Sequence, residues 1–148
     1  TIIDDTYNSS PVAVEWALAT LNGLNTQGRK FVALGDMREL GKYADSEHYK
    51  VGQNIARNIV PHELILVGPL SRKIAEGAMA EGYSESRINQ FDNSRDAGKY
   101  LEKIIQTGDV VLAKGSQNTI RMEWLVEEIM AHPEDKEKLL VRQEDFWR

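Results

Sequence analysis

The chain alternates short apolar runs with segments in which apolar residues recur every three or four positions. Short apolar runs are typical of buried strands, and the three-to-four spacing is typical of helices packed on one face. Strands and helices that alternate in this way indicate βαβ units and a parallel sheet. The predicted strands are Thr1–Asp4, Phe31–Leu34, Leu64–Val67, Ile88–Phe91 and Val110–Ala113. We therefore expect an α/β fold, with a three-layer, Rossmann-like, doubly wound and mostly parallel sheet in a single domain.

Five apolar stripes predict the helices between and after these strands. The stripes are Val14, Ala17, Leu18, Leu21 and Leu24; Val51, Ile55 and Ile59; Ile74 and Ala78; Ala97, Leu101, Ile104 and Ile105; and Met122, Leu125, Val126 and Ile129. Pro11 suits the first position of the first helix, where no amide donor is needed. The expected N-caps are Ser9 or Ser10 for the first helix, Asp45 or Ser46 for the second, and Asn93 or Ser94 for the fourth.

Polar segments follow the first, second and fifth predicted strands, at residues 4–11, 35–41 and 114–118. The carboxyl ends of parallel strands meet at one edge of the sheet, which is where open α/β sheets bind ligands. The three segments together place these candidates on one rim: Asp4, Asp5, Asn8, Asp36, Glu39, Lys114 and Ser116. The sequence contains no Gly-rich phosphate loop ending in Gly-Lys-Ser/Thr. We therefore expect the rim to be part of a site and not a whole one.

Composition narrows the range of functions. The 148 residues are enough for one domain with its own core, and a net charge of −5 argues against a general nucleic-acid binder. The absence of cysteine excludes disulfides and thiolate chemistry, and no apolar run is long enough to span a bilayer. With no secretory leader either, we expect a cytoplasmic protein without a membrane partner. The histidines His48, His62 and His132 are scattered, so we expect no metal site.

The character of the chain changes after Pro133. Residues 134–138 form a charge run, and the last residues include Phe146 and Trp147. We interpret residues 1–132 as one domain and residues 133–148 as a C-terminal arm that docks its aromatic side chains. Because the chain opens directly in a predicted strand, we expect it to be a domain of a longer protein.

Five short motifs follow one another along the chain: Asp5-Thr6-Tyr7-Asn8-Ser9-Ser10-Pro11, Leu34 to Gly41, His48 with Gly52, Lys114-Gly115-Ser116, and Met122-Glu123. In this order, over residues 4–131, they resemble the C-terminal domain of the Mur ligases, the ATP-dependent amide-forming enzymes of peptidoglycan precursor synthesis. Within that family the chain is most similar to the branch that adds D-alanyl-D-alanine. The pattern of that branch is Asp-x-Tyr-Asn-Ala-Asn-Pro, Leu-Gly-Asp-Met-x-Glu-Leu-Gly, His-x-x-x-Gly, Lys-Gly-Ser-Arg and Met-Glu.

Two positions depart from this pattern. Ser9-Ser10 stands where the family has Ala-Asn, and Gln117 stands where the family has an arginine. That arginine is a natural partner for a substrate carboxylate. Without that arginine, the identity of the amine substrate stays open, unless Arg121 or Arg38 binds the substrate carboxylate.

The resemblance implies an activity shared with domains that are missing here. The whole ligase would add D-alanyl-D-alanine to UDP-muramyl tripeptide with ATP and Mg2+, and this domain would close over ATP and the incoming dipeptide. The missing N-terminal domain would hold the uridine nucleotide, and the missing central domain would supply the phosphate loop and the magnesium ligands. By motif position, Asp5 would contact the ATP ribose, with Tyr7 and Asn8 beside the nucleotide. The chain alone would have no catalytic residue and no ligase activity.

The resemblance also implies roles on the side of the amine substrate. The segment from Asp36 to Glu39 would face the dipeptide, and Glu39 would hold its ammonium group. Lys114 would balance the charge of a phosphate or of the dipeptide carboxylate, and Ser116 would offer its hydroxyl to an anion. His48 fits a buried structural partner of the second loop as well as it fits a ligand.

Three other interpretations stay open. A phospho-receiver domain also has an acidic pair after its first strand and a lysine after its fifth, as Asp4-Asp5 and Lys114 provide here. The phosphoacceptor of a receiver, however, follows the third strand, whereas Asp36 follows the second. The chain also fits a stand-alone nucleotide- or peptide-binding module, or an amide ligase that uses another amino acid.

Overall fold

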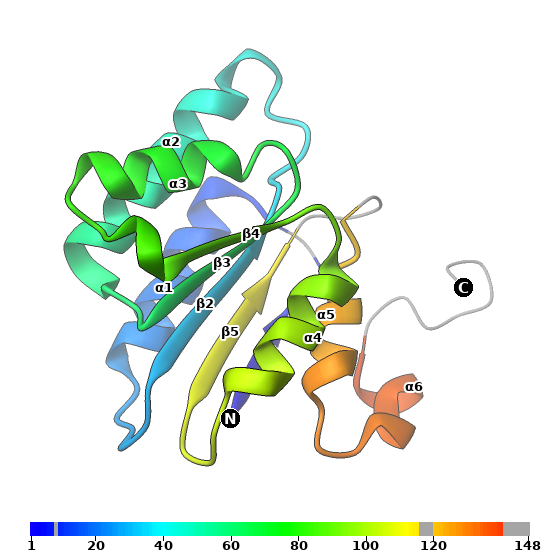
Figure 1. The fold of residues 1–148 in the computed structure, drawn as a ribbon. Helices are drawn as coiled ribbons and strands as arrows, with labels where there is room; N and C mark the ends of the chain where they lie inside the picture. The colour runs from blue at the N-terminus through cyan, green and yellow to red at the C-terminus, as the bar shows by residue number, and fades with distance from the viewer. Residues whose placement is uncertain (8, 116–119, 141–148) are drawn as a thin grey trace.

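The structure of the protein is a computed structural model, and the residues that it describes are 1–7, 9–115 and 120–140. Its centre is one sheet of five parallel strands in the order β1-β5-β2-β3-β4 (Figure 1). The strands are β1 (Ile2–Asp5), β2 (Lys30–Gly35), β3 (Glu63–Val67), β4 (Ile88–Phe91) and β5 (Val110–Lys114). Their ends lie within one residue of the predicted ends, and the α/β parallel-sheet prediction is confirmed.

Helices cover both faces of the sheet, which makes three layers (Figure 1). The helices are α1 (Pro11–Gly23), α2 (Ala44–Asn54), α3 (Arg72–Ala80), α4 (Ser94–Ile104), α5 (Glu123–Ile129) and α6 (Lys136–Leu139). Shorter turns are the 3-10 segments η1 (Gly41–Tyr43), η3 (Glu85–Arg87) and η4 (Pro133–Asp135), and the π-helical turn η2 (Ile55–Ile59). The first three helices pack on one face of the sheet, and α4 and α5 pack on the other. Successive strand side chains alternate between the two apolar cores, as Val32 and Ala33 of β2 do.

Two helices begin at the side-chain N-caps that the sequence predicts. Ser10 caps α1 by accepting a hydrogen bond from the Ala13 N–H (3.2 Å), and Asn93 caps α4 through the Asp96 N–H (2.8 Å), as expected. The second helix differs, because α2 begins at Ala44 directly after η1, and no described side chain caps it. A turn of tighter 3-10 helix leads into α2 in place of the predicted cap.

Two glycines let α2 and α3 cross at short range. A Cβ at Gly52 would lie 1.9 Å from the Ile74 carbonyl oxygen, and a Cβ at Gly77 would lie 2.0 Å from the Tyr49 carbonyl oxygen. Neither helix can carry a side chain at its crossing residue without moving away. Because Gly52 lies one helical turn after His48 on the same side of α2, this crossing also fixes the place of His48.

Three neighbouring strands, β1, β5 and β2, end at the edge to which the sequence assigns a site. Asp5 of β1 pairs in register with Lys114 of β5, and Lys114 pairs with Leu34 of β2. The segments that follow these strands therefore open side by side, as predicted.

The described part of the C-terminal arm packs on the domain. Leu140 enters the apolar core that α4 and α5 cover, and the Lys136 ammonium donates to Glu127 Oε1 at 2.9 Å. The predicted docking of Phe146 and Trp147 falls outside the described residues, and the boundary at residue 132 stays a prediction. Of the helices within the described ranges, none is long and apolar enough to cross a membrane.

Candidate functional site

An ion pair joins the ends of β1 and β5. The Lys114 ammonium donates a hydrogen bond to Asp5 Oδ2 at 2.7 Å, between residues from opposite ends of the chain. The Lys114 side chain is 2% exposed, whereas that of Asp5 is 47% exposed. The predicted role of Lys114, to balance the charge of a phosphate or of the dipeptide carboxylate, stays a prediction. The charge-assisted bond fixes the Asp5 carboxylate, and the exposure of Asp5 leaves that carboxylate accessible to a ligand.

The turn after β1 is built around Asp4. Its Oδ1 accepts hydrogen bonds from the Thr6 N–H (3.2 Å) and the Thr6 hydroxyl (2.7 Å), which turns the chain toward α1. Desolvation raises the pKa of the Asp4 carboxyl, and the Thr6 hydrogen bonds only partly oppose this rise. Tyr7, next along the turn, is 59% exposed. The predicted ligand Asn8 lies outside the described residues.

Asp36 follows β2 and is fully buried, and its predicted place on the side of the amine substrate stays a prediction. Its Oδ1 accepts a hydrogen bond from the Ser71 N–H (2.8 Å), and the Ser71 hydroxyl donates to the Gly68 carbonyl oxygen (2.6 Å). Burial raises the pKa of the Asp36 carboxyl, and the Ser71 N–H only partly opposes that rise. Gly68 has a φ of 103°, and a Cβ there would clash with the Asp36 carboxylate. Asp36 therefore ties the loop after β2 to the loop after β3.

His48 on α2 holds the loop after β2 from another direction. The fully buried ring accepts a hydrogen bond from the Met37 N–H at Nε2 (2.9 Å) and donates from Nδ1 to the Ala44 carbonyl oxygen (2.6 Å). An N–H donor facing Nε2 requires the tautomer that carries its proton on Nδ1. Between these anchored residues, Arg38 and Glu39 are exposed, and Glu39 has a left-handed φ of 63°. The loop is thus fixed at its base and open at its tip.

The segment after β5 begins close to buried Met122. A Cβ on Gly115 would lie 2.3 Å from Met122 Cγ, and a Cβ on Gly35 would lie 3.0 Å from the same atom. The ends of β2 and β5 are therefore packed over one side chain. The predicted anion ligand Ser116 and the departure at Gln117 both lie outside the described residues.

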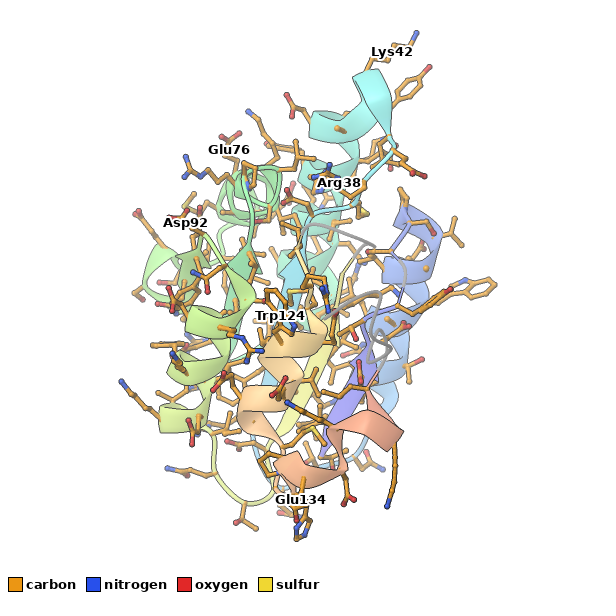
Figure 2. All side chains as sticks on the ribbon, turned by 90° about the vertical axis from the view of Figure 1, so that its right-hand side faces the viewer. Arg38, Lys42, Glu76, Asp92, Trp124 and Glu134 are labelled. Carbon is orange, nitrogen blue, oxygen red and sulfur yellow. The ribbon has the colours of Figure 1, made fainter. Side chains whose placement is uncertain are left out.

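Arg121 is engaged in a neighbouring cluster. It forms an ion pair with buried Glu123, and its guanidinium lies 4.6 Å from the centre of the Trp124 ring. Figure 2 shows Trp124 on α5, while Arg38 lies farther up, with the loop after β2. Arg121 and Arg38 are the two arginines proposed as partners of a substrate carboxylate. Of these two, Arg38 is the more exposed.

Comparison with known proteins assigns the chain to a family. Residues 1–117, which contain all five strands and the Asp5–Lys114 pair, match the family described as Mur ligase, glutamate ligase domain. This chain belongs to the Mur ligase family. Its fold and the order of its motifs agree with that membership.

Among Mur ligases, the chain is similar to D-alanyl-D-alanine-adding enzymes. It is 29% identical over 132 residues to the UDP-N-acetylmuramoyl-tripeptide--D-alanyl-D-alanine ligase of Bacillus subtilis, over 89% of this chain and 28% of that protein. It is 32% identical over 134 residues to the ligase of the same name from Mycobacterium tuberculosis (strain ATCC 25618 / H37Rv), over 78% of this chain and 26% of that protein. The chain spans less than a third of the length of these relatives.

Solved Mur ligase structures agree with this assignment. The MurF ligase from Thermotoga maritima in complex with ADP superposes with a TM-score of 0.68 at 25% identity, over 91% of this chain and 29% of that chain. MurF from Acinetobacter baumannii superposes with a TM-score of 0.72 at 25% identity, over 86% of this chain and 27% of that chain.

The structure of this Mur ligase domain separates the predicted site residues into two groups. Asp5, Tyr7 and Glu39 are exposed or half-exposed near the carboxyl ends of β1 and β2, while Asp36 and Lys114 are buried. Sequence reasoning missed Ser71, the residue that bonds Asp36, because no motif marks the segment after β3. The only available signal was that β3, like β2, ends at the same edge of a parallel sheet.

Proposed function

We propose that this chain is the C-terminal domain of a ligase that adds D-alanyl-D-alanine to UDP-N-acetylmuramoyl-tripeptide in peptidoglycan synthesis. The main support is the half-exposed carboxylate of Asp5, fixed by Lys114 beside a loop that exposes Glu39. The relatives named above carry this activity in their names. Because this chain spans less than a third of them, the uridine nucleotide site and the phosphate loop would belong to other domains of a longer protein.

ATP fits the turn after β1. One oxygen of the Asp5 carboxylate accepts a hydrogen bond from Lys114. Because the Asp5 side chain is half exposed, the carboxylate can also accept hydrogen bonds from two ribose hydroxyls. Tyr7 offers an exposed ring in the same turn. When bound, ATP supplies the phosphoryl group that activates the tripeptide carboxylate. A related MurF ligase has been solved with ADP, which supports a nucleotide site in such proteins.

The amine substrate fits the loop after β2. The exposed Glu39 carboxylate would bind the ammonium group of D-alanyl-D-alanine, and the neighbouring guanidinium of Arg38 would bind the carboxylate of the dipeptide. Both ends of the dipeptide would then be held by one fixed loop. Orientation of this kind can lower a barrier by several kcal/mol, because the amine is presented to the activated carbonyl in a single geometry.

Mg2+ would be held by another domain. In the ranges that the structure describes, no group of three or more histidine, cysteine, aspartate or glutamate side chains is arranged to hold an ion. The two acidic residues at the end of β1 instead accept hydrogen bonds: Asp4 from Thr6, and Asp5 from Lys114. We therefore expect the isolated chain to release no phosphate from ATP.

Two substitutions in the whole ligase test the nucleotide and amine sites separately. Asp5→Asn should raise the KM for ATP about tenfold and leave the KM for D-alanyl-D-alanine unchanged, because it removes a charged acceptor. Glu39→Gln should raise the KM for D-alanyl-D-alanine about tenfold and leave the KM for ATP unchanged. Glu76→Gln, at an exposed position on α3, is the control. Reversed effects, or two variants that match the wild type, would contradict the assignment.

A further inference from the structure

The loop between β2 and α2 carries a strained residue at its exposed tip. Glu39 has a φ of 63°, in the left-handed region that residues other than glycine avoid, and Gly41 follows at 55°. Such a conformation persists only where the surrounding structure holds it. The contacts at the base of the loop should therefore contain the restraint.

His48 supplies this restraint from inside the protein. Its two ring nitrogens bond to the Met37 N–H (2.9 Å) and to the Ala44 carbonyl oxygen (2.6 Å), at the two ends of the segment that contains Glu39. The rigid ring therefore fixes the separation of those ends. His48 and Met37 are both fully buried, so water does not compete for the bond between them. The bond from Ser71 to Asp36 fixes only the start of the segment.

We propose that His48 is a positioning residue for the amine substrate. Through the Met37 N–H, it keeps the loop in the conformation that exposes Arg38 and Glu39 at the carboxyl edge of the sheet. Because His48 is fully buried, it acts on the substrate only through this loop. The inference rests on the proposed function and adds to it the residue that sets the geometry of the amine site.

Two substitutions separate positioning from stability alone. In His48→Gln, the side-chain carbonyl oxygen reaches the place of Nε2 and can accept the hydrogen bond from the Met37 N–H. In His48→Asn, the shorter amide reaches the place of Nδ1 and can donate to the Ala44 carbonyl oxygen, so the Met37 N–H loses its acceptor. Each variant keeps one of the two hydrogen bonds of the buried ring and loses the other, so both should lose stability.

The test is the steady-state kinetics of the whole ligase that contains this chain, with ATP, UDP-N-acetylmuramoyl-tripeptide and D-alanyl-D-alanine. His48→Asn should raise the KM for D-alanyl-D-alanine about tenfold, with the KM for ATP within about twofold of wild type. His48→Gln should keep both values within about threefold of wild type. Tyr83→Phe removes a buried hydrogen bond to the Pro61 carbonyl oxygen (2.8 Å), at the amino ends of the strands. This control should leave both KM values unchanged.

The outcomes distinguish this inference from the proposed function. If the two His48 variants have equal KM values for D-alanyl-D-alanine and differ from the wild type only in the amount of active enzyme, the positioning role is overturned. The proposed function would stay intact. A KM for ATP that rises as much as the KM for the dipeptide in His48→Asn would also overturn the role. A wild-type ligase that forms no amide with D-alanyl-D-alanine would overturn both.

Discussion

Replacing Gly52 with alanine tests the packing that holds α2, and with it His48, in place. At the crossing of α2 and α3, the added Cβ would lie 1.9 Å from the Ile74 carbonyl oxygen and 2.7 Å from the Ala78 nitrogen. Ordinary contacts of a Cβ begin near 3.4 Å, so the helices must separate locally by about 1.5 Å. The obstructing atoms belong to the backbone of α3, and no side-chain rotation can relieve the clash.

The cost follows from the packing lost around the crossing. Val51, Ile55, Ile74 and Ala78 are all buried there, and a radial gap of about 0.5–1 Å already removes roughly a quarter to a half of a contact's dispersion energy. Overpacking typically costs about 1–3 kcal/mol, and two backbones in contact indicate the upper end, about 3 kcal/mol. The better helix propensity of alanine offsets about 1 kcal/mol. The free energy of unfolding should therefore fall by about 2 kcal/mol.

Denaturant unfolding of the purified chain, followed by far-UV circular dichroism, measures this free energy. Gly23→Ala is the matched control, because Gly23 ends α1 and a Cβ there meets nothing within 4 Å. That variant should gain up to about 1 kcal/mol from the same helix propensity. A Gly52→Ala variant as stable as the wild type, or more stable, would refute the close crossing of α2 and α3.

Three further substitutions can be tested by thermal melts. Val60 is β-branched yet has a left-handed φ of 47°, so Val60→Asn should stabilise the protein by about 1 kcal/mol. A lower midpoint of the melt would contradict the left-handed conformation at this residue. Burial raises the pKa of the Asp109 carboxyl, but hydrogen bonds from Arg29 and Gln106 outweigh it and hold the pKa below its usual value. Its stabilisation is complete above the unfolded pKa of about 3.9 and is lost as the pH falls through the folded pKa. Asp109→Asn should thus lower the free energy of unfolding by about 2 kcal/mol at neutral pH and by progressively less in acid. A difference from the wild type that does not change with pH would refute the ion pair between Asp109 and Arg29. Ser10→Ala should cost about 1 kcal/mol through loss of the α1 cap, and an unchanged midpoint would contradict it.

The strands were predictable because the sheet is covered on both faces. Each residue of Phe31–Leu34 is buried, so the run is apolar throughout and stands out from the helices around it. The order of the strands was not predicted. β5 is the last strand in the chain, yet it lies between β1 and β2, and the apolar pattern of a strand does not specify its neighbours.

The candidate site was predictable in position and only partly in detail. Asp5 and Asp36 both follow apolar runs, and the sequence predicted both as ligands. Asp5 lies on an edge strand and is half exposed, whereas Asp36 follows a central strand and is covered by the loop that contains Ser71. The burial of Asp36 depends on a contact across 35 positions of the chain, which no local pattern contains. The two possible roles of His48 likewise needed the positions of Met37 and Ala44 to separate them.

Amine choice by the whole ligase is the most direct measurement of what this domain serves. The enzyme would be given ATP, UDP-N-acetylmuramoyl-tripeptide and equal amounts of D-alanyl-D-alanine, L-lysine and diaminopimelate, and the products would be identified by mass spectrometry. We expect the D-alanyl-D-alanine amide to dominate, with phosphate released in step with amide formation. A product that contains another amine, or no amide at all, would contradict the function proposed here.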